Sequence, residues 1–367
     1  MNRFEIFLVA TPSMEPLLCQ EAIEKGFAGA QVVDGGVTFE GGWPDVWRAN
    51  LVLRGATRVL ARFASFRAMH LAQLDKRSRK VDWASVLRAD VPVRVDVTSR
   101  KSKIYHAGAA QQRIETAIKE TIGAQITKDA EIVVKVRIFD DLVSISLDTS
   151  GESLHKRGHK EAVNKAPMRE TLAALFLRQC GYDGTFPVYD PMCGSGTFVI
   201  EAAEWAMGLN PGRSRAFAFE KLASFDADAW SNMKKTGSVA AIPLHFYGSD
   251  RDMGAIRMSH ANAARAGVSS ITKFEQAAIS DSKAPDGPKG LIMINPPYGG
   301  RIGERKLLFS LYGAMGQALR QNFEGWRLGL VTNDAGLAKA TGLSFLPTTP
   351  PISHGGIKVT LYQTDVL

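Results

Sequence analysis

The sequence contains little cysteine and no long uninterrupted hydrophobic run. Its 367 residues include three cysteines, Cys19, Cys180 and Cys193, which lie far apart and form no CxxC pair. This pattern excludes a disulfide framework and indicates no zinc site, so we expect reduced thiols and no bound metal. No apolar stretch reaches the roughly 18 residues that a membrane-spanning helix needs, and charges interrupt the N-terminal apolar run. We therefore expect a soluble, cytoplasmic protein without a membrane partner.

Positive charge is in excess and is concentrated in one part of the chain. The formal net charge is +8, from 45 Lys and Arg against 37 Asp and Glu. Between Arg58 and Arg113 there are thirteen basic and four acidic residues, a local excess of nine. Any single cluster of this kind can simply be a solvated surface. Two clusters in one segment, DKRSRK and SRKSK, favour a surface that binds the phosphate backbone of a nucleic acid.

The first half of the chain alternates short β-rich runs with amphipathic helices. We predict strands at 4–10, 30–42 and 91–100, and two strands around Asp140 and Asp141 within 131–150. Helices are predicted at 14–26 and 110–123, each ended by its glycine, Gly26 or Gly123. The strict alternation of apolar and polar residues predicts α+β structure whose sheet has one solvated face. Such a segment presents a surface rather than enclosing a cofactor.

The second half follows a different pattern, in which short apolar strands alternate with helices. After a polar, basic connection and a helix at 168–181, strands are predicted at 186–190, 243–250, 271–278, 290–297 and 327–333. Helices are predicted between them at 196–208, 252–267 and 307–323. This order predicts a parallel, doubly wound sheet with helices on both faces. The tail at 356–366 alternates and is expected to close the sheet as an antiparallel edge strand.

A glycine-rich turn follows the first of these strands. In DPMCGSGT, the strand ends at Asp190, Gly194 and Gly196 lie in the turn, and a helix begins near Thr197. Ligands bind beyond the carboxyl ends of strands in doubly wound sheets, and glycines let the backbone approach them closely. The turn lacks the Lys-Ser/Thr pair of a phosphate loop and the GxGxxG spacing of dinucleotide enzymes. Although a short glycine turn alone is often structural, Asp190 at the strand end favours a nucleotide-like cofactor site.

The next strand ends in YGSDRDMGA. A carboxylate at this position can accept hydrogen bonds from both hydroxyl groups of a ribose, and we assign that role to Asp250. Asp252 can instead cap the following helix, which is an ordinary role for Asp there.

The stretch NPPYGG follows the apolar run Leu291–Ile294, and its prolines must end that strand. The side-chain oxygen of Asn295 and a backbone carbonyl in the Pro296-Pro297 pair can together accept hydrogen bonds from one exocyclic NH2 group. Proline fixes φ, so these acceptors would be in place before a substrate arrives. Tyr298 offers a flat face on which a flipped-out base can stack. A Pro-Pro turn that merely ends a strand would explain the rigidity but not the adjoining amide and aromatic side chains.

DPMCGSGT followed by NPPYG resembles the S-adenosylmethionine-dependent amino-methyltransferases, which methylate exocyclic amines of adenine or guanine. The string SLHKRGHKEAVNKAPMRETLAA and the basic first half resemble the THUMP-domain RNA methyltransferases, in particular the bacterial 23S rRNA guanine-N2 enzymes and the related tRNA guanine-N2 enzymes. The resemblance covers nearly the whole chain. It implies S-adenosyl-L-methionine as the cofactor and RNA as the partner.

The same resemblance implies the fold and its division into domains. The fold class is an α/β doubly wound, Rossmann-like methyltransferase domain preceded by an α+β region that is ferredoxin-like and THUMP-like. The expected parts are a ferredoxin-like domain at 1–60, a THUMP RNA-binding domain at 61–155, a linker at 156–166 and the methyltransferase domain at 167–367. Residues 210–230 are expected to form an insertion in the last domain, as in the resembled rRNA enzymes.

The resemblance also implies roles for individual residues. The residues expected to bind the cofactor are Asp190, Pro191, Cys193, Gly194, Gly196, Thr197, Asp250, Asp281 and Asn295. Those expected to hold the target amine and base are Asn295, Pro296, Pro297 and Tyr298. Those expected to contact RNA are Arg77, Arg79, Lys80, Arg100, Lys101, Lys103, Lys156 and Arg157. One position departs from the family, because Ala277 and Ala278 stand where an acid usually contacts the cofactor's adenine; Asp281 or a backbone group would have to replace it.

Three functions are therefore open. The first is methylation of a guanine N2 in structured RNA, most simply 23S rRNA, with tRNA as an alternative substrate. The second is methylation of an adenine N6 in DNA or RNA. The third is an RNA-binding module that has kept the cofactor fold without catalysis, which the presence of both Asn295 and Tyr298 disfavours. The oligomeric state is left open.

Overall fold

The structure is a computed structural model that describes residues 3–161, 168–235, 242–298 and 302–367. The chain divides into two compact units. Unit 1 comprises Met1–Ala10, Cys19–Leu154 and Arg215–Thr236, and unit 2 comprises Thr11–Leu18, His155–Ser214 and Gly237–Leu367. The four-part division stays a prediction. Residues 162–166 of the expected linker and residues 299–301 after Tyr298 lie outside the described part.

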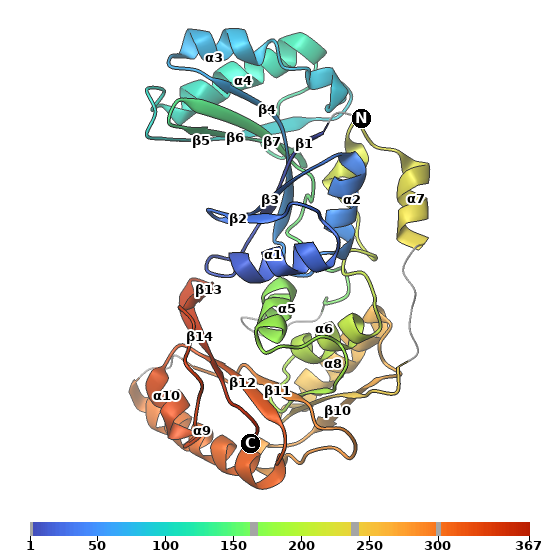
Figure 1. The fold of residues 1–367 in the computed structure, drawn as a ribbon, viewed down its shortest axis with the longest axis vertical. Helices are drawn as coiled ribbons and strands as arrows, with labels where there is room; N and C mark the ends of the chain where they lie inside the picture. Colours follow the sequence, from blue (N-terminus) through green and yellow to red (C-terminus); the bar gives the residue numbers. More distant parts are fainter. Residues whose placement is uncertain (1–2, 162–167, 236–241, 299–301) are drawn as a thin grey trace. The chain divides into compact units, whose positions relative to one another are not determined.

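Unit 1 is built on one seven-stranded sheet in the order β2-β3-β1-β4-β7-β6-β5 (Figure 1). Its strands are β1 (Phe4–Val9), β2 (Gln31–Val33), β3 (Gly36–Gly41), β4 (Arg58–Arg67), β5 (Val93–Arg100), β6 (Ile132–Phe139) and β7 (Leu142–Asp148). All neighbours are antiparallel except β5 and β6. β4 pairs with β1 near its start and with β7 along its length, so it continues the sheet across the domain boundary predicted at residue 60.

The helices of unit 1 confirm several local predictions. They are α2 (Trp43–Val52), α3 (Leu71–Ser78), η1 (Trp83–Ser85), α4 (Ala107–Ile122), η2 (Ala218–Lys221), α7 (Ala227–Lys235) and the greater part of α1 (Glu15–Glu24), whose first four residues belong to unit 2. Gly123 ends α4 with φ of 75°, a left-handed conformation that glycine adopts without strain. Asp140 and Asp141, with φ of 49° and 59°, form the tight turn between β6 and β7, where the sequence placed it.

Most of the insertion in the second half of the chain, from Arg215 onward, packs into unit 1 rather than unit 2. Its Phe219 lies edge-on to Trp230, with ring centroids 5.0 Å apart, and also stacks against Trp47 at 6.2 Å. The backbone N–H of Phe219 donates to Thr149 O at 3.0 Å. We predicted from the sequence that this segment would belong to the methyltransferase domain. Contacts between residues so distant in the chain leave no local pattern that could have shown otherwise.

Unit 2 confirms the predicted doubly wound sheet, whose order is β10-β9-β8-β11-β12-β14-β13. Its strands are β8 (Val188–Asp190), β9 (Phe246–Asp250), β10 (Thr272–Gln276), β11 (Leu291–Ile294), β12 (Arg327–Thr332), β13 (Ile352–His354) and β14 (Ile357–Gln363). The strands from β10 to β12 are parallel. The tail forms β14 and pairs antiparallel with β12, which confirms its predicted orientation. It is not the outermost strand, because the short β13 pairs outside it.

Helices cover both faces of this sheet (Figure 1). They are α5 (Glu170–Gln179), α6 (Thr197–Ala206), α8 (Met253–Ala266), α9 (Ile302–Asn322) and α10 (Ala335–Ala340), with η3 (Ile279–Asp281) after β10. Leu291 and Met293 of β11 pack in the core with α5, α6 and α8, whereas Ile292 and Ile294 pack in the core with α9 and α10. All four side chains are therefore buried, as a central parallel strand requires.

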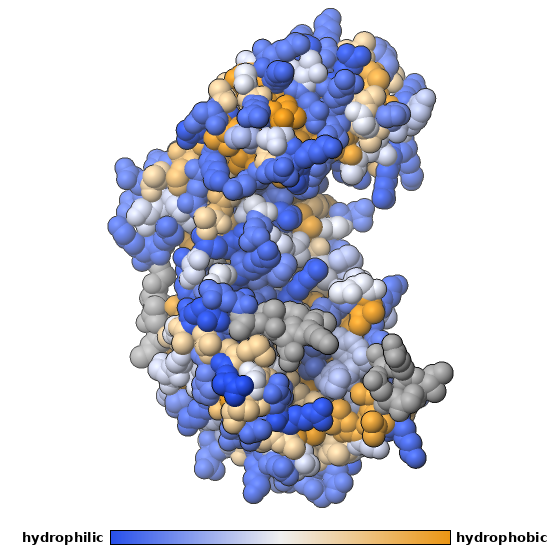
Figure 2. Space-filling view, turned by 180° about the vertical axis from the view of Figure 1, so that it is seen from behind, coloured by the Kyte–Doolittle hydropathy of each residue, from blue (hydrophilic) through white to orange (hydrophobic). Residues whose placement is uncertain are grey.

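The surface carries mainly polar side chains on the face shown in Figure 2, with apolar atoms exposed in smaller areas between them. Across the described ranges, no helix is both long and apolar enough to cross a membrane. All three cysteines are buried and free.

Close packing around Gly248 in β9 makes a first prediction. A Cβ at this position would lie 2.7 Å from Phe274 Cδ1 and 3.1 Å from Cys193 Cβ. We expect Gly248→Ala to lower the free energy of unfolding by about 1–3 kcal/mol through overpacking, as measured by denaturant titration.

The matched control is Gly313→Ala in α9, where an added Cβ would meet only Ala340 O, at 3.7 Å. Because glycine is a poor helix former, this variant should be neutral or more stable by about 0.5–1 kcal/mol. Equal stability of the two variants would contradict the packing at β9.

Candidate functional site

The carboxylate of Asp250, at the end of β9, holds two backbone groups in place. Its Oδ2 accepts a hydrogen bond from Gly194 N at 3.0 Å, and its Oδ1 accepts one from Asp252 N at 2.9 Å. Each oxygen keeps a further lone pair that can accept from a ligand hydroxyl. Asp252 caps α8 by accepting from Gly254 N at 2.8 Å, which is the ordinary role weighed for it from the sequence.

The glycine-rich loop between β8 and α6 is fixed by side chains of α8. Ser259 Oγ donates to Gly194 O at 2.9 Å, and Asn262 Nδ2 donates to Ser195 O at 3.0 Å. Gly194 and Gly196 have φ of 55° and 81°, and a Cβ at Gly196 would lie 3.1 Å from Ser259 Oγ. The loop therefore needs glycine for its backbone conformation, and at Gly196 for its packing as well.

Asp190 and Cys193 of this loop are both buried. Asp190 Oδ1 accepts from Met192 N at 3.0 Å. Burial, together with the nearby charge of Asp250, raises the pKa of Asp190 from its ordinary 3.8 to about 8. Burial likewise raises the pKa of the Cys193 thiol well above its ordinary value, so Cys193 is a packed, neutral side chain. Pro191 lies between them and is buried too.

Thr197 and Asp281, also predicted to bind the cofactor, lie at the start of α6 and at the end of η3. The Thr197 hydroxyl accepts a hydrogen bond from Lys160 Nζ at 3.1 Å, and Lys160 pairs with Glu170 at 3.0 Å. Asp281 is exposed, and its carboxylate accepts from Ser280 Oγ at 3.2 Å. The structure thus directs the Thr197 side chain toward a neighbouring lysine and leaves Asp281 accessible beyond β10.

Asn295 follows β11, the strand that runs parallel to β8 and next to it. Strands β8 and β11 are where the order of the sheet reverses, and ligands bind beyond the carboxyl ends of strands at such a point. The Oδ1 atom of Asn295 is buried and has no hydrogen-bond partner within the described structure. An acceptor left unpaired in this way costs free energy unless a ligand supplies a donor.

The residues after Asn295 are held from two other elements. Tyr312 OH in α9 donates to Pro297 O at 3.4 Å, and Tyr298 OH lies 3.2 Å from His354 Nδ1 in β13. Pro296 is buried and Pro297 is exposed. Sequence reasoning missed Tyr312 and His354 because each contacts the motif only through the tertiary fold.

The basic residues predicted to bind RNA fall into three groups. Arg100, Lys101 and Lys103 are exposed at the end of β5 and in the following loop. Asp141 anchors this loop: its Oδ1 accepts from Lys103 N at 2.8 Å, and its own N–H donates to Ser102 Oγ at 3.0 Å.

The second group, Arg77, Arg79 and Lys80, is exposed at the end of α3, where Arg79 is engaged in ion pairs with Asp75 and Glu120. The third group is Lys156 and Arg157. Arg157 is buried and its Nη2 lies 3.2 Å from Glu201 Oε1, which is buried as well. The predicted RNA contact of Arg157 is therefore wrong, because this side chain neutralises an interior carboxylate.

Two protein-family models match parts of this chain. Residues 157–350 match the protein family described as RMKL-like, methyltransferase domain. The chain belongs to the RMKL-like methyltransferase family. Residues 5–60 match the RlmL ferredoxin-like domain, which confirms the ferredoxin-like part of the predicted fold class.

Two curated relatives of this RMKL-like chain differ in length. A Synechocystis sp. protein, provisionally named an RNA methyltransferase, is 29% identical over 98% of this chain and 96% of its own. The ribosomal RNA large subunit methyltransferase K/L of Psychromonas ingrahamii is 32% identical over 92% of this chain but only 47% of its own. The chain thus spans about half the length of the K/L relatives.

Two solved structures share the fold along the whole chain. The first is a Listeria monocytogenes protein described as a predicted N6-adenine-specific DNA methylase. It is 28% identical to this chain with a TM-score of 0.90, and the match covers 100% of this chain and 97% of that protein. Another protein, provisionally described as a methyltransferase, was solved with S-adenosylhomocysteine; it is 27% identical with a TM-score of 0.87, covering 99% of this chain and 98% of its own. S-adenosylmethionine is the cofactor expected for this chain from its sequence motifs.

The site fits that cofactor chemically. The left-handed glycines keep side chains off the loop, Asp250 retains lone pairs for ribose hydroxyls, and Asn295 Oδ1 is an unpaired acceptor. No group of three or more His, Cys, Asp or Glu side chains in the described ranges is arranged to hold a metal ion.

The raised pKa of Asp190 makes a second prediction, for the protein without cofactor. The unfolded chain loses this proton near pH 3.8, whereas the folded chain keeps it to about pH 8. Between these values the folded state binds more protons, so stability falls as the pH rises, by up to about 1.4 kcal/mol per pH unit. We expect Asp190→Asn to remove this dependence in melting temperatures measured from pH 5 to 9.

The exposed Asp281→Asn variant is the control and should keep the pH profile of the unaltered protein. Parallel profiles for Asp190→Asn and the unaltered protein would show that the Asp190 carboxyl ionises normally.

Proposed function

We propose that this protein transfers the methyl group of S-adenosylmethionine to the exocyclic N2 of a guanine in large-subunit ribosomal RNA. The observation that carries the proposal is the unpaired, buried Oδ1 of Asn295, adjoining a rigid proline pair and Tyr298 at the sheet's reversal point. An exocyclic amine on a flat ring suits these groups. Its two N–H donors can bond the Asn295 amide oxygen and a proline carbonyl, and its ring can stack on Tyr298.

The chain's own residues then orient the amine rather than deprotonate it. Asn295 Oδ1 accepts one N–H, and the Pro296 carbonyl is favoured for the other because Pro297 O already accepts from Tyr312. These acceptors stabilise the positive charge that develops on the nitrogen as it attacks, and the stack on Tyr298 holds the line of approach. S-adenosylmethionine supplies a methyl group that its sulfonium charge has already activated, so no strong base is required.

The cofactor roles are part of this proposal. Asp250 would accept from the ribose hydroxyls, and the glycine-rich loop would lie along the methionine end. The buried carboxyl of Asp190 ionises more readily when a cation lies close by, which suits a sulfonium ligand. Asp281 remains the proposed contact for the adenine.

RNA binding is proposed for the loop after β5. Arg100, Lys101 and Lys103 are exposed there, and Tyr105 two residues further on is 86% exposed. Cations that contact phosphates beside an aromatic ring that can stack on a base are typical of RNA-binding surfaces. We retain the THUMP-like assignment of this region on that basis, and a ribosomal substrate would place the protein in the cytoplasm.

An adenine-N6 methyltransferase is the second candidate, because the Listeria relative carries that description. The same acceptors would serve an adenine amine, so the geometry of Asn295 leaves the base open; the basic surface of unit 1 favours RNA over DNA as the substrate. The tRNA guanine-N2 alternative differs only in the RNA. Mapping methylated bases in total RNA from strains with and without the gene decides among the RNA candidates. Incubating the protein with labelled cofactor and either total RNA or duplex DNA decides between RNA and DNA, and label appearing only in DNA would overturn the proposal.

The role of Asn295 makes a third prediction. Asn295→Ala should lower kcat by roughly 10²–10³-fold, the cost of removing one preset hydrogen-bonding group, while cofactor affinity changes little. Initial rates with labelled cofactor and calorimetric binding of S-adenosylhomocysteine measure the two effects. Asn295→Asp, which keeps an acceptor, should retain more activity than the alanine variant. Undiminished turnover by Asn295→Ala would refute the assigned role.

The basic loop makes a fourth prediction. Reversing the charge of Lys101 and Lys103 to Glu should weaken RNA binding and reduce the slope of log affinity against log salt by about one for each phosphate that the variant no longer neutralises. Filter binding of rRNA at several salt concentrations measures both. Unchanged affinity and slope would place the RNA surface elsewhere.

A further inference from the structure

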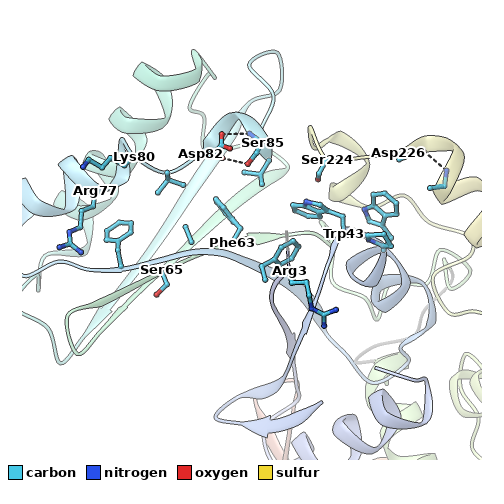
Figure 3. Close-up of a pocket in the computed structure, with 18 residues that line it drawn as sticks. Arg3, Trp43, Phe63, Ser65, Arg77, Lys80, Asp82, Ser85, Ser224 and Asp226 are labelled. Atoms are coloured by element: carbon cyan, nitrogen blue, oxygen red, sulfur yellow. Dashed lines mark hydrogen bonds between the residues drawn. The ribbon is translucent and has the colours of Figure 1, made fainter. Parts of the chain in front are cut away.

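Unit 1 contains a pocket of about 1180 Å³, in which Arg77 and Lys80 are the only lining residues that already have a predicted role. Its walls come from five places: the start of β1, the first half of α2, the middle of β4, the segment from α3 to η1, and the insertion between α6 and β9. Figure 3 shows Arg77 and Lys80 on one side, Trp43 and Ser224 on the other, and Phe63 between them. The volume exceeds the roughly 300–1,000 Å³ of ordinary small-ligand pockets, so more than one flat group can enter.

Aromatic rings form the floor of this pocket. Trp43 is partly exposed and leans on Phe4, with ring centroids 5.1 Å apart. Phe63 lies where the pairing of β4 with β7 shifts register, between Arg62 and Ala64, and its ring rests edge-on against the buried Trp83 at 5.8 Å. An irregularity of this kind redirects a side chain out of the normal alternation, so the strand presents Phe63 to the pocket.

Some charged side chains of the pocket are already hydrogen-bonded within the protein, whereas others are not. Asp82 accepts from Ser85 N at 3.3 Å and Asp226 from Ala229 N at 2.9 Å, so both acids cap the turns that follow them. Arg3 donates to Glu40 O at 2.7 Å. Arg77 and Lys80 are exposed, and neither side chain forms an ion pair or hydrogen bond in the described structure. The cations at that end are therefore available to an anionic ligand.

Two polar atoms in the walls also lack partners. Trp47 Nε1 and Ser224 Oγ are buried and make no hydrogen bond within the described residues. Polar groups of this kind are usually satisfied by a ligand or by water.

We propose that this pocket binds unpaired nucleotides of the RNA substrate, at a site separate from the one where the base is methylated. Trp43 and Phe63 stack on the bases, and Arg77 and Lys80 bind the phosphates. Single-stranded RNA combines flat apolar rings with regularly spaced anionic groups, and both features match these walls. The proposal rests on RNA being the substrate, and it adds a sequence-tolerant anchor that holds a single-stranded segment.

Binding of two labelled oligomers to the full chain tests the pocket. The probes are fluorescein-labelled hexauridylate and an abasic ribose-phosphate hexamer of the same length, followed by fluorescence anisotropy. The unaltered protein should bind hexauridylate about tenfold more tightly than the abasic oligomer, the effect expected from one base–aromatic stack. Trp43→Leu should abolish that difference, and Trp43→Phe should restore it.

Charge is tested with the double variant Arg77→Gln, Lys80→Gln. It should weaken binding of both oligomers and reduce the salt slope by about 0.7 for each phosphate left without a cation. Lys119→Gln, an exposed lysine on α4 outside the pocket, is the matched control and should leave both values unchanged. Circular dichroism melting confirms that each variant is folded.

The proposal would be overturned if the unaltered protein bound the two oligomers equally well. It would also be overturned if the Trp43 and Arg77 variants bound them as tightly as the Lys119→Gln control does. A protein ligand would then be the occupant to seek. Methyl transfer to total RNA is measured in parallel. Pocket-dependent binding without transfer would refute the proposed function and leave the pocket assigned, whereas transfer with pocket-independent binding would refute the pocket alone.

Discussion

The site depends on the burial of β11 between two cores. Leu291 and Met293 pack on one side, Ile292 and Ile294 on the other, and β8 and β12 pair along its edges. A strand enclosed in this way cannot rotate or slip by one residue without exposing apolar side chains. Because prolines end the strand directly after Asn295, the amide and the carbonyls that follow inherit that fixed position. The rigidity of the motif thus comes as much from the strand before it as from the prolines.

A binding site whose polar groups are fixed before the ligand arrives contains groups that lack favourable partners in the free protein. Asn295 Oδ1 has no partner in the described structure, and burial keeps the Asp190 carboxyl neutral to about pH 8. Both features reduce the stability of the free protein. The fixed, unpaired acceptor of Asn295 would also lower the cost of reorganisation for the proposed amine substrate, which is how preset polar groups in a water-poor site favour a charged transition state. The surrounding contacts from α8, α9 and β13 compensate, since they hold the loop and Tyr298 through groups that are themselves paired.

Sequence reasoning reached those parts of the structure that are encoded locally. Asp190 and Asp250 end parallel strands and Asn295 directly follows one, so their placement at the same edge of the sheet follows once the alternating pattern is recognised. Contacts between distant segments were not accessible. The burial of Arg157 depends on Glu201, 44 residues away, and a basic residue in a polar string reads as exposed. His354 lies 56 residues beyond Tyr298, on a strand of three residues too short for periodicity to reveal.

The insertion between α6 and β9 takes the chain from unit 2 into unit 1 and back again. The chain leaves the Rossmann-like fold after Ser214, contributes Arg215–Thr236 to unit 1, and returns to form β9 with Asp250 at its end. Phe219 stacks on Trp47 and packs edge-on against Trp230, and Ser224 and Asp226 complete the wall of the pocket in unit 1. Unit 1 therefore cannot build that pocket from the N-terminal half of the chain alone. The proposed RNA-binding pocket therefore forms only once Arg215–Thr236, from the second half of the chain, has packed into unit 1.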